Sequence, residues 1–274
     1  MEVYTILFPV AAVSGIGLLC AVMLTVVSKV MAVRVDERVT EVRDALPGAN
    51  CGACGYAGCD GYAAALIEDG VKPNLCVPGS DGVARRVSEL LGVEFEDVIE
   101  RVAVCHCGGA ESVVEKKMEY GGVRSCAAAK MLYGGEASCR YGCIGYGDCA
   151  KVCPNGAICI EDGVARINPR RCTGCGLCAK ECPNGVITTL PDYVTTVIKC
   201  SSRDRGADVR RKCKCGCIAC MRCVRECPNG AIEVRDNLAV IDYDKCGGCG
   251  HCAEVCTMKC VKIASFAGVF NKAD

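Results

Sequence analysis

The chain begins with a long apolar stretch, and no charged residue occurs over Val3–Ser28. Glu2 precedes this run, and the basic residues after it are Lys29, Arg34 and Arg38. About 20 apolar residues span a bilayer as a helix, and the positive-inside rule places the rest of the chain in the cytoplasm. A cleaved signal peptide is the alternative, but its positively charged start is missing. The pattern predicts a single-pass protein of the cytoplasmic (inner) membrane, in contact with membrane lipid.

After the apolar run, the pattern changes to short amphipathic segments. It predicts helices over residues 36–46 and 61–69 and an amphipathic helix over residues 83–104, where apolar positions alternate with charged ones. Short β-type segments at Val164–Ile167 and Leu238–Ile241 predict strands.

Cysteine is the unusual component, with 29 among 274 residues. Such a fraction is typical of small disulfide scaffolds, but most of these cysteines lie two or three residues apart, which suits a metal better. Reduced thiols in this number imply a reducing compartment. Lys plus Arg and Asp plus Glu are 32 each, Trp is absent and aromatics are 5%, so nothing predicts nucleic-acid binding.

The first cysteine group follows the helix predicted over residues 36–46. Glycines between its members let the backbone pass close to an inorganic core. Four thiolates also suit zinc, so zinc is the alternative to an iron–sulfur cluster here. The predicted ligands of this first cluster are Cys51, Cys54, Cys59 and Cys76.

The later cysteines form an internal repeat with a constant offset of 74 residues. The first block is Cys126, Cys139, Cys143, Cys149 and Cys153, and it maps onto Cys200, Cys213, Cys217, Cys223 and Cys227. The second block is Cys172, Cys175, Cys178 and Cys182, and it maps onto Cys246, Cys249, Cys252 and Cys256. The chain therefore holds two copies of one module.

The later copy contains two runs of the bacterial two-cluster ferredoxin type, in which the fourth cysteine of one run ligates the cluster of the other. One cluster is predicted at Cys217, Cys220, Cys223 and Cys256. The other is predicted at Cys246, Cys249, Cys252 and Cys227.

The earlier copy departs from this pattern, because Tyr146 stands where the later copy has Cys220. Its regular cluster is predicted at Cys172, Cys175, Cys178 and Cys153. Its irregular cluster is predicted at Cys139, Cys143, Cys149 and Cys182, with a three-iron cluster as the alternative.

The sequence thus predicts at least five 4Fe–4S clusters, with iron held by cysteines. A sixth is a further hypothesis: any four of the remaining cysteines Cys107, Cys126, Cys200, Cys213 and Cys215 could bind it, and the preferred set is Cys107, Cys126, Cys200 and Cys213. Cys105, Cys159 and Cys260 are interpreted as thiols that bind no metal.

The predicted fold class is α+β: one N-terminal transmembrane helix, a small 4Fe–4S domain, and two tandem bacterial-type ferredoxin modules. The expected boundaries are a transmembrane anchor at 1–33, the small 4Fe–4S domain at 34–82, a helical linker at 83–125, and ferredoxin modules at 126–199 and 200–274.

The order of these parts is an N-terminal membrane helix, the Cys51–Cys59 motif with Cys76, and then ferredoxin modules. This order resembles that of the B subunit of the Rnf complex, an ion-translocating ferredoxin:NAD oxidoreductase. Two modules look like the long form found in strict anaerobes. The resemblance implies that the chain accepts electrons from reduced soluble ferredoxin. It also implies transfer to membrane subunits that bear flavins and move Na⁺ or H⁺, and finally to NAD on another subunit.

Two alternatives remain at this stage. One is a polyferredoxin subunit of a membrane hydrogenase or formate-oxidising complex, and the other is a metal- or cluster-storage protein. The sequence has no G-x-G-x-x-G after a strand and no P-loop. We therefore expect no flavin or NAD on this chain, no catalytic residues, and no substrate-turnover site apart from the complex.

Overall fold

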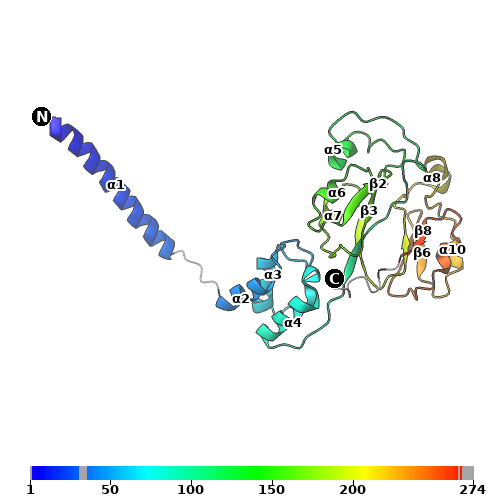
Figure 1. The fold of residues 1–274 in the computed structure, drawn as a ribbon, viewed down its shortest axis with the longest axis horizontal. Coiled ribbons are helices and arrows are strands. Elements are labelled where there is room, and N and C mark those ends of the chain that lie inside the picture. Colours follow the sequence, from blue (N-terminus) through cyan, green and yellow to red (C-terminus); the bar gives the residue numbers. More distant parts are fainter. Residues whose placement is uncertain (1, 31–35, 265, 267–274) are drawn as a thin grey trace.

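The structure is a computed structural model that describes residues 2–30, 36–264 and 266. Its helices are α1 (Glu2–Val30), α2 (Glu37–Ala45), α3 (Cys59–Glu68), η1 (Pro73–Leu75), η2 (Val77–Gly79), α4 (Ser80–Leu91), α5 (Cys126–Met131), α6 (Asp148–Lys151), α7 (Leu177–Glu181), α8 (Gly206–Lys212), α9 (Arg222–Arg225) and α10 (His251–Glu254). Its strands are β1 (Arg101–Cys105), β2 (Ile158–Glu161), β3 (Val164–Ile167), β4 (Ile187–Pro191), β5 (Thr196–Ile198), β6 (Ile232–Arg235), β7 (Leu238–Ile241) and β8 (Val261–Ile263). Together they form the α+β fold that the sequence predicts (Figure 1).

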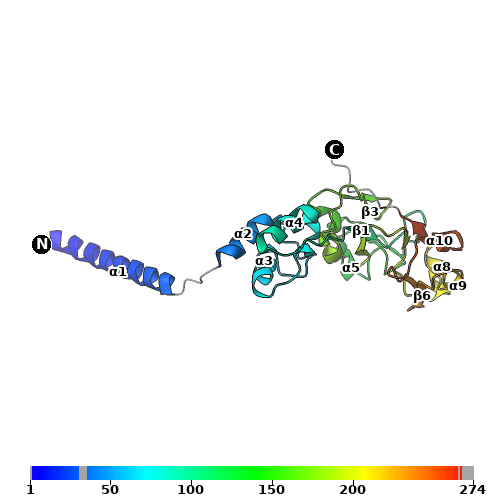
Figure 2. The same ribbon diagram turned by 90° about the horizontal axis from the view of Figure 1, so that it is seen from below.

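Helix α1 matches the predicted membrane segment. Its stretch Val10–Lys29 has a mean hydropathy of 2.5, and none of it is buried in the protein. In Figures 1 and 2 the helix projects away from the rest of the chain. Its apolar side chains are therefore available to lipid. Arg34, which contributes to the predicted orientation, lies outside the described residues.

A small helical domain follows, built from α2, α3 and α4. Helices α2 and α3 confirm two of the predicted helices. Asp36 caps α2 by accepting a hydrogen bond from the Arg38 backbone N–H at 3.0 Å. Val42, Tyr62 and Val87 are fully buried where the three helices meet.

The helix predicted over residues 83–104 is wrong in its second half. Helix α4 ends at Leu91, because Gly92 adopts the left-handed conformation (φ 66°) that commonly terminates a helix. Residues 101–105 instead form β1, whose last four residues are all buried. Val102 and Val104 are β-branched and suit this strand.

The 74-residue repeat recurs in the tertiary structure. The elements α6, β2, β3, α7 and β4 begin 74 residues before α9, β6, β7, α10 and β8. Strands β2 and β3 form one antiparallel pair, and β6 and β7 form its equivalent. Strands β3 and β7 have the predicted bounds, so both predictions are confirmed.

Each module is completed by a strand from an earlier part of the chain. Strand β1 pairs antiparallel with β4, and β5 pairs antiparallel with β8. Residues 101–105 therefore belong to the sheet of the first module and 196–198 to that of the second. The domain boundaries given above stay a prediction.

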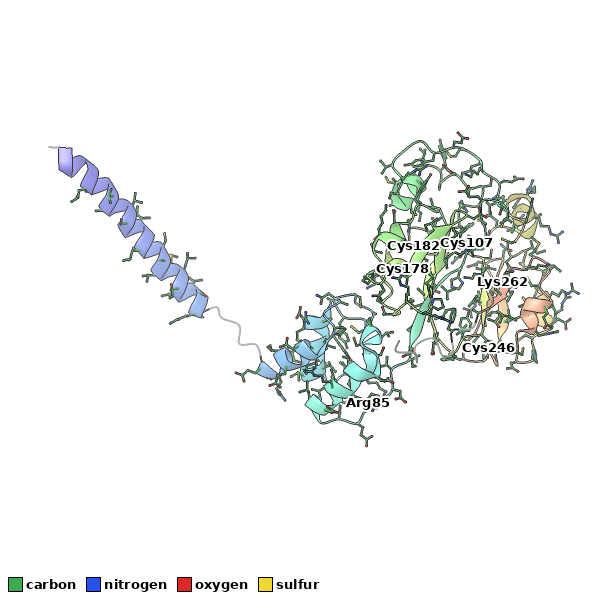
Figure 3. The ribbon with its side chains drawn as sticks, viewed as in Figure 1. Arg85, Cys107, Cys178, Cys182, Cys246 and Lys262 are labelled. Carbon is green, nitrogen blue, oxygen red and sulfur yellow. The ribbon has the colours of Figure 1, made fainter. Side chains whose placement is uncertain are left out.

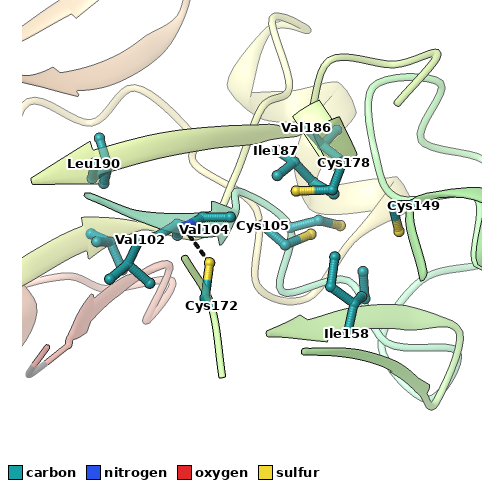
Figure 4. Close-up of a cluster of buried hydrophobic side chains, with 14 of the residues drawn as sticks. Val102, Val104, Cys105, Cys149, Ile158, Cys172, Cys178, Val186, Ile187 and Leu190 are labelled. Atoms are coloured by element: carbon teal, nitrogen blue, oxygen red, sulfur yellow. Dashed lines mark hydrogen bonds between the residues drawn. The ribbon is translucent and has the colours of Figure 1, made fainter. Parts of the chain in front are cut away.

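The cores of both modules mix thiols with small apolar side chains. Figure 4 shows the core of the first module, where Cys149, Cys172 and Cys178 lie among Val186 and Ile158. The second core likewise contains Cys217, Cys223 and Cys252. Thiols thus occupy places that aliphatic side chains fill in other proteins.

Candidate iron–sulfur sites

The first site lies in the small domain, and we call it the small-domain site. Its members come from the loop before α3, the start of α3 and the η1–η2 turn. Burial raises the pKa of Cys76 to about 11, and the charges of the three other thiols add to this effect, so all four lie close together. Asn50 Oδ1 accepts a hydrogen bond from the Cys59 N–H at 2.8 Å and anchors the loop to α3. The four thiols are Cys51, Cys54, Cys59 and Cys76.

In both modules the cysteines of the regular runs lie together. In the first module one cavity, here the Cys172 site, is lined by Cys153, Cys172, Cys175 and Cys178. In the second module one cavity, the Cys217 site, is lined by Cys217, Cys220, Cys223 and Cys256 together with Cys260. The remaining set lies around Cys252, whose pKa is raised by burial and then by the charges of three other thiols. This Cys246 site consists of Cys227, Cys246, Cys249 and Cys252.

Backbone N–H groups point at the sulfurs of these sites. Ala103 of β1 donates to Cys172 Sγ at 3.4 Å (Figure 4), and Ala157 donates to Cys153 Sγ at 3.3 Å. Ala231 repeats the second contact at Cys227 Sγ, at 3.4 Å. Such donors stabilise a thiolate rather than a thiol.

The irregular run differs from the predicted set. Cys143, Cys149 and Cys182 line one cavity, as predicted, but the fourth thiol of that cavity is Cys126 and not Cys139. We call this cavity the Cys143 site. Cys126 is the first residue of α5, the helix that precedes α6 in the chain, and its thiol lines this cavity.

Helix α5 is held at the Cys143 site by Asp148, the first residue of α6. The Asp148 carboxylate accepts hydrogen bonds from Ser125 Oγ at 2.7 Å and from the Ala127 N–H at 3.2 Å. Cys126 therefore sits where the missing cysteine of the run would otherwise contribute. The sequence indicated that this run needs a cysteine from another segment, because Tyr146 occupies the position equivalent to Cys220.

Cys139 lies instead in a cavity between the two modules, here the central site. Cys107, Cys139, Cys200 and Cys213 line it, together with Cys215 and Cys143. Three of the four thiols proposed from sequence for a sixth cluster meet here, while Cys126 lines the Cys143 site. In Figure 3 the labels of Cys107, Cys178 and Cys182 stand together, and that of Cys246 stands below them.

Glycines and backbone donors shape the central site. A Cβ on Gly109 would lie 3.5 Å from Cys107 Sγ and 3.9 Å from Cys213 Sγ. A Cβ on Gly142 would lie 3.5 Å from Cys107 Sγ and 3.8 Å from Cys139 Sγ. The small residues thus leave the space between these sulfurs open. Cys200 Sγ accepts the N–H groups of two residues, Cys217 at 3.2 Å and Ser202 at 3.4 Å.

The donor sets fit clusters better than single ions. Among the described residues, no three His, Cys, Asp or Glu side chains converge closely enough to hold one metal ion. At the central, Cys217, Cys143 and Cys172 sites the thiols line cavities, and a 4Fe–4S core is bound by four such thiolates.

The thiols fall into two electrostatic classes. Burial raises the pKa of Cys149 to about 12 and that of Cys223 to about 11. By contrast, hydrogen bonds from neighbouring thiols lower the pKa of Cys143 to about 6 and that of Cys256 to about 5. Cys105 is the neighbour of Cys143, and Cys260 is the neighbour of Cys256.

Comparison with known families agrees with these sites. The Fe-S cluster family model (FeS) matches residues 46–78, around the small-domain site. A 4Fe-4S binding domain model matches residues 165–188. A 4Fe-4S dicluster domain model matches residues 216–260, which contain both cysteine runs of the second module. The irregular run from Cys139 to Cys149 lies outside these matches.

Similar whole proteins decide the family. The chain is 41% identical, over 93% of its length and 77% of the relative, to the B subunit of the Na(+)-translocating ferredoxin:NAD(+) oxidoreductase complex of Acetobacterium woodii. It is 40% identical to the B subunit of the proton-translocating complex of Clostridium ljungdahlii, over 93% of this chain and 90% of that one. The chain belongs to this family of B subunits. The B subunit of the ion-translocating oxidoreductase complex of Methanosarcina acetivorans is 39% identical over 93% of this chain and 97% of its own.

Membership in the B-subunit family confirms the resemblance drawn from the cysteine motifs. It also explains the combination of a lipid-facing helix with an iron–sulfur domain of the FeS type. The chain is thus an iron–sulfur electron-transfer subunit of a translocating oxidoreductase complex, and the hydrogenase and storage alternatives are set aside.

Proposed function

We propose that this subunit accepts electrons from reduced soluble ferredoxin and conducts them to membrane subunits of its complex, and through them to NAD⁺, with coupled Na⁺ or H⁺ transport. A bound 4Fe–4S cluster supplies a one-electron couple at each site. The observation that carries the proposal is that thiols line four cavities of the two modules, and that two further groups of four thiols lie in the small domain and in the second module.

We propose a ligand set for each of these six sites. Four sets are those predicted from sequence: the small-domain, Cys172, Cys217 and Cys246 sites. The Cys143 site takes Cys126, Cys143, Cys149 and Cys182. The central site takes Cys107, Cys139, Cys200 and Cys213.

The order of the sites follows from residues that neighbouring sites share. Lys180 Nζ donates to the Cys51 carbonyl at 2.7 Å, and a cavity of about 550 Å³ is lined by both Cys54 and Cys175. The small-domain site is therefore next to the Cys172 site. The Cys172 and Cys143 sites then share a ferredoxin module, in which each run supplies a cysteine to the other's cluster.

The central site links the two modules. Cys143 lines both the Cys143 cavity and the central cavity. On the other side, the N–H of Cys217 donates to Cys200 Sγ at 3.2 Å. The series thus runs from the small domain through the Cys172, Cys143, central and Cys217 sites to the Cys246 site.

The membrane anchor gives this series a direction. The small-domain site begins shortly after α1 along the chain and must therefore stay near the bilayer, whereas the Cys246 site ends the series. We propose that ferredoxin delivers electrons to the second module and that they leave near the membrane. Lys29 at the end of α1 favours a cytoplasmic location for all six sites.

The function is tested by reducing the purified full-length protein with reduced ferredoxin in the absence of oxygen. We expect about 24 iron atoms per chain, four for each of six clusters, and reduction of this iron within the time of complex turnover. Colourless protein, zinc in place of iron, or iron that ferredoxin cannot reduce would contradict the proposal.

Lys180→Ala tests the contact between the small domain and the first module. The lost hydrogen bond is expected to cost about 1 kcal/mol, which corresponds to about fivefold faster amide exchange in residues 51–55. Lys151→Ala is the matched control, because Lys151 has the same place on α6 that Lys180 has on α7 but pairs with Asp148. Equal exchange rates in the two variants would show that the Lys180 contact contributes nothing.

A further inference from the structure

A position four residues after the last cysteine of each ferredoxin run is buried in all four runs. Three runs place an aliphatic residue there: Ala157, Val186 and Ala231. The fourth run has Cys260, which is equally buried. The fold therefore needs only a small apolar group at this position, and the thiol of Cys260 is an addition to it.

The Cys260 thiol faces the Cys217 site. Its Sγ lies 3.6 Å from Cys256 Sγ, and Cys260 lines the same cavity as Cys217 and Cys256. The cavity thus has five thiols although a 4Fe–4S cluster takes four, and Cys260 is the one outside the ferredoxin pattern.

The first module has a comparable thiol that comes from another strand. The residue equivalent to Cys260 is Val186, but Cys105 at the end of β1 belongs to the buried cluster against which Cys143, the equivalent of Cys217, packs. Figure 4 shows Cys105 and Val186 in the same buried cluster.

The two modules exchange a thiol and an aliphatic residue between two positions, the last residue of one strand and the residue that precedes its partner strand. Cys105 pairs with Ile187 across β1 and β4, and the equivalent pair in the second module is Ile198 with Val261. One module thus has Cys105 with Val186, and the other has Ile198 with Cys260. Both modules thus bury one additional thiol in the cluster that contains their ferredoxin cysteines, although its position in the chain differs.

We propose that Cys260 is not a ligand but donates an S–H hydrogen bond to the Cys256 sulfur of the Cys217 site, and thereby raises the reduction potential of this cluster. This inference rests on the ligand sets of the proposed function. A donor stabilises negative charge on a thiolate, and reduction adds one negative charge to the cluster. Hydrogen bonds to the sulfurs are among the factors that set such potentials.

The experiment is an EPR-monitored redox titration of the full-length protein with Cys260→Ala, Cys260→Val and Cys260→Ser. Alanine and valine are tolerated at the equivalent positions, so both variants should fold and keep the iron content of the unchanged protein. We expect one cluster to become harder to reduce by about tenfold in its reduced-to-oxidised ratio, which is about 59 mV for one electron. Serine retains a donor and should largely restore the potential.

Ala231→Cys provides the opposite change at the Cys246 site, beside Cys227. It should raise the potential of one cluster, while Cys159→Ala, which removes an exposed thiol on β2, should shift none. Unchanged potentials in Cys260→Ala and Cys260→Val at full iron content would overturn the inference and leave the electron relay intact. Loss of about four iron atoms from both would instead identify Cys260 as a ligand and also overturn it.

Discussion

Replacing Cys139 with alanine is expected to abolish electron transfer between the two modules while both clusters of the first module remain. Cys139 lines the central site, which shares Cys143 with the Cys143 site and links it to the Cys217 site in the proposed series. The variant should lose about four iron atoms, and ferredoxin-dependent NAD⁺ reduction by the assembled complex should fall close to background. Iron analysis and turnover of the complex measure the two effects.

Double variants decide to which site Cys139 belongs. If Cys139 and Cys182 serve different clusters, Cys139→Ala with Cys182→Ala should cost about eight iron atoms, whereas Cys126→Ala with Cys182→Ala should cost about four. The ligand set predicted from sequence requires the reverse. Cys159→Ala is the control for unspecific loss and should keep all the iron, because Cys159 is exposed on β2.

Removal of iron by anaerobic chelation is expected to unfold both ferredoxin modules. Their sheets are two-stranded, and such pairs are marginal in water without further packing. Their cores contain thiols in place of large apolar side chains. By analogy with small zinc domains, metal binding contributes about 10 kcal/mol or more to folding. Circular dichroism and limited proteolysis under anaerobic conditions would record the loss.

The small domain provides an internal comparison for iron removal. Helices α2, α3 and α4 bury Val42, Tyr62 and Val87 against one another independently of thiols. The helical signal should therefore fall less than the strand signal, and protease cuts should appear first after residue 105. Modules that stay protease-resistant without iron would show that the protein core is sufficient alone.

Local patterns determined much of this architecture. The uncharged run predicted α1, and β-type residues predicted β3 and β7 with their observed bounds. These elements follow from periodicity and composition within a few residues of chain. The helix over residues 83–104 failed for a related reason: its apolar positions also suit a strand, and the pairing of β1 with β4 decided between the two.

The cluster ligands divide in the same way. The spacing of cysteines within one run, such as Cys246, Cys249 and Cys252, assigns them to one cluster. The fourth ligand, which comes from the other run, is assigned from the repeat. Cys126 and Cys139 are 13 residues apart in a segment with no regular spacing, and both are near the same run. Spacing therefore assigned Cys139 to the run, whereas helix α5 carries Cys126 there.

By itself, the sequence determined the family, the apolar N-terminal helix and the repeat, and it predicted the sites whose cysteines are close neighbours in the chain, because hydrophobic length and ligand spacing are local properties. The tertiary structure decided the central site and the placement of Cys105 and Cys260. Cys107, Cys139 and Cys200 come from segments that meet only when β1 joins the first module and β5 joins the second. Contacts between such distant segments depend on packing, which no local pattern encodes.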